Sequence, residues 1–213
     1  MDAVTDTRKP QAMLLLGPTG SGKTPLGKLL DRAGFRGRPC RHFDFGDRLR
    51  RVVAESLSID GLGKRDVRFL ASVLHRGALL EDEQFPLAER ILRAFIAAGS
   101  AGGGEASWIV LNGLPRHVGQ ARAIDAIVDV RVVVELTCPA DVVRRRIRAD
   151  AGGDRAGRAD DDARLVEEKL ATYVARTAPL LAHYRRRGAA VLTVPIGPDT
   201  TSGQARDILS RTD

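Results

Sequence analysis

Eight residues near the start of the chain have the types and the spacing to hold phosphate groups. Residues 17–24 read Gly-Pro-Thr-Gly-Ser-Gly-Lys-Thr and directly follow an apolar run that ends at Leu16. Glycine tolerates backbone angles that other residues avoid, so successive N–H groups of such a turn can converge on phosphate oxygens. The residues predicted to bind the phosphates of a triphosphate are Gly17, Gly20, Ser21, Gly22, Lys23 and Thr24.

The last two residues of this turn add charge and a metal ligand. The pattern is that of a P-loop, in which Lys23 reaches the β- and γ-phosphates and Thr24 offers its hydroxyl to Mg²⁺. A helix predicted over residues 26–33 points the positive end of its dipole at the site. Pro25 has no N–H to give, so we predict a weakened contact to the α-phosphate, although proline is also favoured in a first helical turn.

Length and composition indicate one globular domain. The chain has 213 residues, of which 43% are hydrophobic and 29% are charged, as is ordinary for a soluble protein. No stretch has the apolar length of a membrane helix, and residues 1–10 lack the apolar core of a signal peptide. We expect a cytoplasmic protein without a membrane partner. Cys40 and Cys138 stand alone, which indicates neither a zinc site nor a disulfide.

The net charge of +7 calls for a polyanionic partner. A nucleic acid would fit, but aromatic residues make up only 4% of the chain, so platforms for stacking bases are largely missing. Arginines grouped around a nucleotide's phosphates explain the charge equally well. We therefore expect small phosphorylated partners, no nucleic acid and a monomeric chain.

Strands and helices alternate along the sequence. Apolar runs without polar alternation are typical of a buried parallel sheet, and ligands of such folds lie at the carboxyl ends of the strands. The predicted strands cover residues 13–16, 40–43, 108–111, 130–136 and 190–194. The predicted helices cover residues 26–33, 48–57, 64–76, 86–98, 118–128, 140–148, 163–187 and 202–210, with a kink at Pro179. The fold class is α/β, with a five-stranded parallel sheet between helices.

Several segments beyond the turn carry a family resemblance. They are residues 42–50 (His-Phe-Asp-Phe-Gly-Asp-Arg-Leu-Arg), residues 112–116 (Asn-Gly-Leu-Pro-Arg) with Gln120, residues 157–161 (Gly-Arg-Ala-Asp-Asp), and residues 177–180 (Thr-Ala-Pro-Leu) with Tyr184. Together with the P-loop, and in this order, they resemble the adenylate kinase family from about residue 13 to about residue 194. The resemblance implies a three-layer P-loop NTPase fold. It also implies one kinase domain over 1–213, with a helical acceptor-binding segment at about 44–85 and a short lid at about 149–162.

The resemblance assigns roles to residues of this chain. Phosphoryl transfer needs alignment and neutralised charge, and arginine's planar fork suits both. Arg155 could replace Arg158, and the Arg146 alignment could slip within its arginine run. The implied catalytic residues are Lys23, Arg116, Arg146 and Arg158; the acceptor-binding residues are Phe45, Arg50, Leu79, Leu80, Gly113, Arg116 and Gln120; the metal site is Thr24, Asp47 and Asn112.

Four positions depart from the family pattern. Phe45 stands where a threonine commonly contacts the acceptor adenine, with Asp44 before it, and Asn112 stands where an aspartate helps to hold the hydration shell of Mg²⁺. Asp150 and Lys169 each replace an arginine. These changes affect how the acceptor is recognised and how tightly the metal binds. The residues that bind the triphosphate mostly match the family pattern.

The leading hypothesis is an ATP- and Mg²⁺-dependent nucleoside monophosphate kinase, with AMP as the first candidate acceptor. A kinase of another small phosphorylated metabolite would use the same frame. A nucleotide-binding regulator with little turnover is the third hypothesis, and it rests on Pro25, Asn112 and Asp150.

Overall fold

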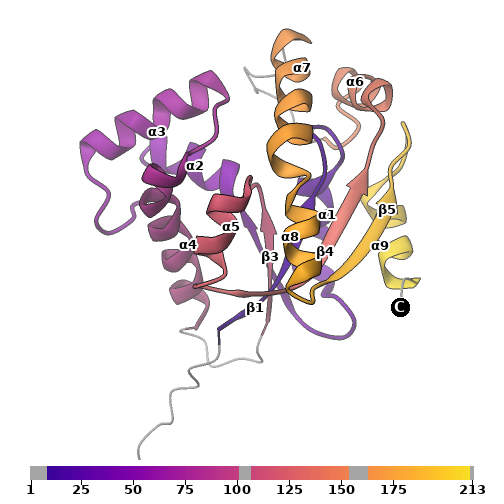
Figure 1. The fold of residues 1–213 in the computed structure, drawn as a ribbon, viewed down its shortest axis with the longest axis horizontal. Coiled ribbons are helices and arrows are strands. Elements are labelled where there is room, and N and C mark those ends of the chain that lie inside the picture. The colour runs from indigo at the N-terminus through magenta and orange to yellow at the C-terminus, as the bar shows by residue number, and fades with distance from the viewer. Residues whose placement is uncertain (1–8, 101–106, 154–162, 212–213) are drawn as a thin grey trace, which may run out of the picture.

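A five-stranded parallel sheet forms the centre of the molecule (Figure 1). The structure is a computed structural model that describes residues 9–100, 107–153 and 163–211. Within these residues the sheet order is β2-β3-β1-β4-β5, and every pair is parallel. The strands are β1 (Gln11–Leu16), β2 (Cys40–Asp44), β3 (Trp108–Asn112), β4 (Asp129–Thr137) and β5 (Ala190–Pro195). The predicted fold class is confirmed.

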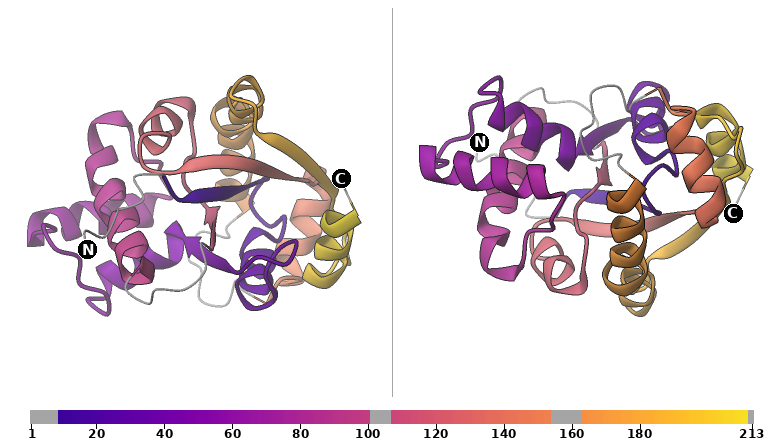
Figure 2. Two further views of the ribbon diagram at one scale, coloured as in Figure 1. Left: turned by 90° about the horizontal axis from the view of Figure 1, so that it is seen from below. Right: turned by 90° about the horizontal axis from the view of Figure 1, so that it is seen from above.

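Alternate residues of β1 face two separate hydrophobic clusters, so helices cover both faces of the sheet (Figure 2). Met13 and Leu15 pack in one cluster with α1 (Lys23–Ala33) and α9 (Ser202–Arg211). Leu14 and its neighbours Ala12 and Leu16 pack in the other. That second cluster includes residues of α4 (Phe85–Ser100), α5 (Val118–Ile124) and α8 (Leu180–Arg186). The result is a three-layer arrangement.

A helical segment connects β2 to β3 and lies to one side of the sheet (Figure 1). It contains α2 (Phe45–Val53), α3 (Lys64–Arg76), the short 3₁₀ turn η1 (Asp82–Gln84) and α4. Helix α2 begins three residues before the predicted start because the Asp44 carboxylate accepts a hydrogen bond from the Asp47 N–H at 3.0 Å. This N-cap ties the start of α2 to the carboxyl end of β2.

The long helix predicted over 163–187 is interrupted. The chain forms α7 (Ala163–Thr172), a π-helical turn η2 (Tyr173–Thr177) and then α8. The Ala178 N–H donates to the Tyr173 carbonyl, five residues back, at 2.8 Å, and Pro179 has no N–H with which to continue the ladder. The predicted kink at Pro179 therefore takes the form of a widened turn just before the proline.

Other boundaries lie within a few residues of their predicted positions, and α2 ends at Val53, four residues before its predicted end. Helix α6 (Ala140–Arg148) has the predicted ends, whereas α5 ends at Ile124, four residues early. Only residues 149–153 of the predicted lid are described; residues 154–162, with Arg155, Arg158, Asp160 and Asp161, lie outside the described residues. Among the helices that the structure describes, none is both long and apolar enough to cross a membrane.

Candidate active site

The phosphate-binding loop joins β1 to α1 with a backbone that requires glycine. Gly17 has φ +152°, and a Cβ atom there would lie 2.7 Å from Ser21 Oγ and 2.8 Å from the Leu136 carbonyl oxygen. Gly20 has φ +74°, and its Cβ would lie 2.9 Å from Ile147 Cγ1. Larger residues would therefore displace the loop from β4 and α6. Gly22 caps α1, which begins at Lys23.

Lys23 lies across this loop. Its Nζ donates to the carbonyl oxygens of Gly17 at 2.7 Å and Pro18 at 2.6 Å, and Ser21 Oγ is 3.4 Å away. The Ser21 side chain is fully buried, so it supports the loop from inside. The lysine charge is thus held at the loop, next to the N-terminus of α1, where both favour an anion.

Three polar side chains meet where β2 and β3 end beside the start of α1. Thr24 Oγ1 donates to Asp44 Oδ2 at 2.6 Å. Asn112 Nδ2 donates to Asp44 Oδ2 at 2.8 Å and to Thr24 Oγ1 at 2.9 Å. Two of the three predicted metal-site residues, Thr24 and Asn112, are therefore in contact. The third, Asp47, is exposed on α2, and the carboxylate in the cluster is that of Asp44.

One cavity of about 220 Å³ brings most of the predicted site together. It lies between the phosphate loop, the helical segment after β2, the turn after β3 and η2. Asp47, Ser21 and Arg146 are not among its lining residues. The predicted residues that line it are Gly17, Gly20, Gly22, Lys23, Thr24, Phe45, Arg50, Leu79, Leu80, Asn112, Gly113, Arg116 and Gln120.

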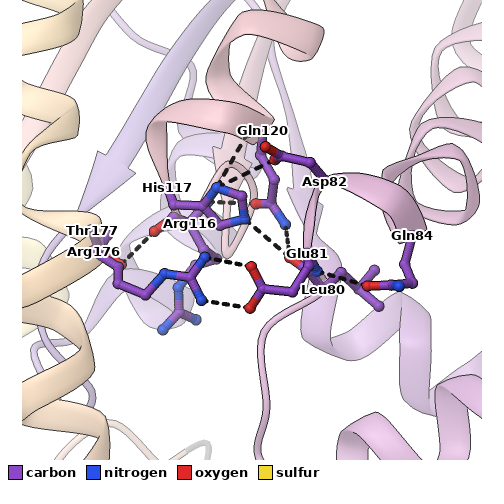
Figure 3. A network of polar contacts seen from close by, with 9 residues as sticks. All are labelled: Leu80, Glu81, Asp82, Gln84, Arg116, His117, Gln120, Arg176 and Thr177. Carbon is purple, nitrogen blue, oxygen red and sulfur yellow. Dashed lines mark hydrogen bonds and ion pairs between the residues drawn. The ribbon is translucent and has the colours of Figure 1, made fainter.

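Arg116 lies four residues after the end of β3, just past a cis Leu114–Pro115 peptide bond. Burial lowers the pKa of its guanidinium, and among the described residues no carboxylate forms an ion pair with it. Its backbone is held on both sides, because the N–H donates to Gln120 Oε1 at 2.7 Å and the carbonyl accepts from Thr177 Oγ1 at 2.8 Å (Figure 3). The result is a partly buried cation on a well-held backbone, suited to an anionic group.

Gln120 connects the turn after β3 to the helical segment. Its side chain is 1% exposed, and its Nε2 donates to the Leu80 carbonyl at 2.8 Å while its Oε1 accepts from Arg116 (Figure 3). His117 Nε2 lies 3.1 Å from the same carbonyl. Leu80 has a buried side chain, whereas Leu79 is half-buried at the cavity. Both the nitrogen and the oxygen of the Gln120 side-chain amide are thus engaged within the protein.

Arg146 lies on the other side of the phosphate loop, beside a smaller cavity of about 130 Å³. Its guanidinium is buried among backbone carbonyls. Nε donates to the Gly20 carbonyl at 3.0 Å, and Nη1 donates to the carbonyls of Gly197 at 2.9 Å and Thr200 at 2.9 Å. A further bond of 3.1 Å reaches the Pro198 carbonyl. The arginine that the resemblance assigned to catalysis therefore joins the phosphate loop to the segment after β5.

Three residues of the cavity deserve separate mention because the predicted site did not include them. Asp44 ends β2, and a polar residue at the carboxyl end of a strand is a signal that could have found it. Lys169 lines the cavity from α7, and Tyr173 lines it from η2, where burial raises its pKa. No local sequence pattern announces a π-helical turn, so Tyr173 could not be placed in advance.

The arrangement suits the transfer of a charged group between two bound ligands. Cations of the loop and of the turn after β3 line one cavity, with Arg50 contributed by α2. Phosphoryl transfer requires little covalent work from the protein, so alignment and charge neutralisation suffice.

Comparisons with known proteins agree with this geometry. The AAA domain family matches residues 13–167. The adenylate kinase of Synechococcus sp. (strain CC9311) is 34% identical over 84% of this chain and 86% of its own length. That of Xanthomonas campestris pv. campestris (strain 8004) is 32% identical over 83% and 86%, and that of Parvibaculum lavamentivorans is 30% identical over 83% and 80%. With its phosphate loop, its parallel sheet and these relatives, the chain belongs to the adenylate kinase family.

Proposed function

We propose that this protein transfers the γ-phosphate of ATP, bound with Mg²⁺, to a nucleoside monophosphate, and that AMP is the first candidate acceptor. One observation carries the proposal: a single cavity is lined by the phosphate loop and by Arg50 and Arg116. Two sets of cationic groups around one space fit a donor and an acceptor whose phosphates must meet. The relatives named adenylate kinase support the same reaction.

The donor half of the site is the P-loop. Its backbone amides and Lys23 bind the triphosphate, and the Lys23 ammonium exchanges its present carbonyl partners for phosphate oxygens. Gly17, Gly20, Ser21, Gly22 and Thr24 shape this cradle.

The acceptor half lies between α2, α3 and the turn after β3. Arg50 and Arg116 bind the phosphate of the acceptor, and their guanidinium groups neutralise charge that spreads during transfer. Phe45, Leu79, Leu80, Gly113 and Gln120 surround its base.

The residues at the ends of β2 and β3 fit a magnesium ion. Hydroxyl, carboxylate and amide oxygens are hard ligands, and Mg²⁺ in phosphoryl-transfer sites takes few of them because phosphates and waters complete its shell. Thr24 would hold it through its hydroxyl, with Asp44 or Asp47 as the carboxylate, and Asn112, whose Nδ2 donates to Thr24 Oγ1, would complete the site. When bound, the ion neutralises phosphate charge.

The remaining assignments complete the proposal. The whole chain acts as one kinase domain, with residues 44–85 as the acceptor-binding segment and residues 149–162 as a short lid that excludes water. Arg146 and Arg158 support the transferred group, Arg146 by holding the phosphate loop. The protein works as a monomer in the cytoplasm, where nucleotides are available, and needs no nucleic acid.

A different acceptor is favoured by two observations at the base-binding end. Phe45 replaces a threonine that in the family contacts adenine, and the oxygen and nitrogen of the Gln120 side-chain amide are engaged with Arg116 and Leu80. Either feature changes the groups that can contact the base of the acceptor. Another phosphorylated acceptor is therefore the second candidate.

The test is turnover with a panel of acceptors. Purified protein with ATP and Mg²⁺ is incubated with each common nucleoside monophosphate, and ADP formation is followed by chromatography. We expect AMP to give the highest kcat/KM, and Lys23→Met to abolish the signal. Activity on another monophosphate alone would correct the acceptor. Binding of ATP without turnover on any acceptor would overturn the kinase proposal and favour a nucleotide-binding regulator.

A further inference from the structure

At the carboxyl ends of β2 and β3, the negative charge lies on a different strand from the one that carries it in the family pattern. Asn112 ends β3, where the family commonly has an aspartate, so a negative charge is missing at that point. The adjacent strand β2 ends in Asp44, and the parallel register pairs Asp44 with Asn112. A carboxylate is therefore present on the same edge of the sheet, one strand away from its usual position.

The contacts of Asp44 fix the orientation of this carboxylate. Its Oδ2 accepts from Thr24 Oγ1 at 2.6 Å and from Asn112 Nδ2 at 2.8 Å. Its Oδ1 accepts from the Asp47 N–H at 3.0 Å. Because both oxygens are engaged, the charge is held beside the phosphate loop and cannot swing into solvent without losing three hydrogen bonds.

The bond from Thr24 is the one that metal binding would use. A threonine hydroxyl that coordinates a cation through a lone pair still carries its proton, and that proton needs an acceptor. Asp44 Oδ2 already accepts it at 2.6 Å. Mg²⁺ also keeps waters, whose protons favour a nearby anion. The neutral Asn112 amide, only 4% exposed, supplies no such charge.

We propose that Asp44 supplies the carboxylate of the Mg²⁺–ATP site, in place of the strand-end aspartate that Asn112 replaces. The inference rests on the proposed function, because it assumes that ATP binds with Mg²⁺ at the phosphate loop. It assigns the role to Asp44 and removes it from Asp47, whose side chain is exposed on α2.

Asp44 is also the N-cap of α2, which needs only an oxygen that accepts from the Asp47 N–H. Asparagine and serine serve that purpose as well as aspartate does. Asp44→Asn therefore keeps the cap and removes the charge, so it separates the metal role from the structural role. Asp44→Ser is a second variant that keeps a capping oxygen.

The experiment measures how ATP binding depends on the metal. Isothermal titration gives the Kd for ATP at a series of Mg²⁺ concentrations and in EDTA. For Asp44→Asn we expect the apparent Mg²⁺ affinity of the ATP complex to fall about tenfold or more. In EDTA the Kd for ATP should stay equal or become tighter, since a negative charge near the triphosphate has been removed.

Three further variants make the result specific. Asp47→Asn tests the competing carboxylate, and Asp66→Asn removes an equivalent carboxylate that bonds the Gly63 N–H at the start of α3. Both should leave the Mg²⁺ dependence within about twofold of the wild type. The exchange Asp44→Asn with Asn112→Asp should restore most of the lost affinity by returning the charge to β3.

The outcomes separate the two proposals. If the wild-type protein binds no ATP with Mg²⁺, the proposed function fails. If it does and both Asp44→Asn and Asp44→Ser keep the wild-type Mg²⁺ dependence, or Asp47→Asn alone shifts it, the assignment to Asp44 is overturned. Equal weakening of ATP binding with and without metal would likewise overturn it, because that pattern marks a damaged loop.

Discussion

Arg116 is a cation that the protein partly buries before any anion is bound. Its backbone is held by Gln120 and Thr177, and burial lowers the pKa of its guanidinium. A charge taken out of water without a partner costs folding free energy. The acceptor's phosphate would supply that partner. The buried charge therefore destabilises the free protein and strengthens the binding of the acceptor.

We therefore predict that Arg116→Met stabilises the free protein and disables the enzyme. The free energy of unfolding should rise by about 1–3 kcal/mol, which corresponds to about 2–4 °C in Tm for each kcal/mol. The kcat/KM for the acceptor should fall by about 10²–10³-fold. Thermal unfolding without ligand and steady-state kinetics measure the two effects.

Arg50→Met is the matched control because Arg50 lines the same cavity but is exposed. It should lower acceptor kcat/KM while the unfolding free energy stays within about 0.5 kcal/mol. A fall in Tm for Arg116→Met would show that its guanidinium is already paired in the free protein.

At the scale of elements, Arg146 of α6 joins the phosphate loop to the segment that follows β5. Four backbone carbonyls accept its hydrogen bonds, and the side chain is 4% exposed. Bonds from a charged donor to buried acceptors are among the stronger ones, and losing the donor leaves those acceptors unpaired. Its main contribution is then to the position of the loop.

Arg146→Met should accordingly lower the free energy of unfolding by about 2–4 kcal/mol. Urea unfolding of the free protein measures this directly. Arg145→Met, which removes an exposed arginine one residue earlier in α6, should change it by less than about 0.5 kcal/mol. Unchanged stability combined with lost turnover would assign Arg146 to the chemistry after all.

A second connection between elements is the ion pair of Glu81 and Arg176, which links the segment before η1 to η2 (Figure 3). Both bonds measure 2.6 Å, and the hydrogen bonds from Arg176 hold the pKa of Glu81 below its ordinary value. A lowered carboxyl pKa stabilises the folded state above the unfolded value of about 4.5, and this contribution disappears as the pH falls through the folded value.

Glu81→Gln should thus lose stability at neutral pH and match the wild type once the pH is well below 4. The loss should be only about 0.5–1 kcal/mol, because the side chains are 49% and 37% exposed and solvent screens the pair. Urea unfolding from pH 7 to pH 3 measures the difference. Glu83→Gln, at an exposed neighbour, provides the reference. An equal deficit at pH 3 would show that the ion pair is not its source.

The sequence predicted elements better than it predicted contacts between them. Apolar runs marked all five strands, and α3 and α6 have their predicted ends, because periodicity and glycine turns are local signals. Arg146 and Gln120 lie on helices that the sequence predicted, yet their partners are carbonyls far along the chain. Such partners follow from packing, which no local pattern contains. Asp44 shows the same limit, since its importance depends on β2 lying beside β3.

At the scale of the whole molecule, the cavity is bounded by the sheet edge, the helical segment after β2, and η2. A ligand that binds only the folded state stabilises it by RT ln(1 + [L]/Kd), about 2.7 kcal/mol at a hundredfold excess over Kd. For a chain of this size that corresponds to roughly 5–11 °C in Tm. The Tm shift caused by each substrate should therefore measure binding to its own half of the site.

We predict that ATP with Mg²⁺ and AMP each raise Tm, and that together they raise it by at least the sum of the separate shifts. To prevent turnover, a non-hydrolysable ATP analogue serves as donor in a thermal-shift assay. Arg116→Met should abolish the AMP shift and keep the donor shift, because only the acceptor half has lost a cation. A donor shift in the wild type with no response to any monophosphate would show that the second half of the cavity binds a different acceptor. Phe45 and the engaged Gln120 amide, which both alter the base-binding end of the cavity, would then explain the change of acceptor.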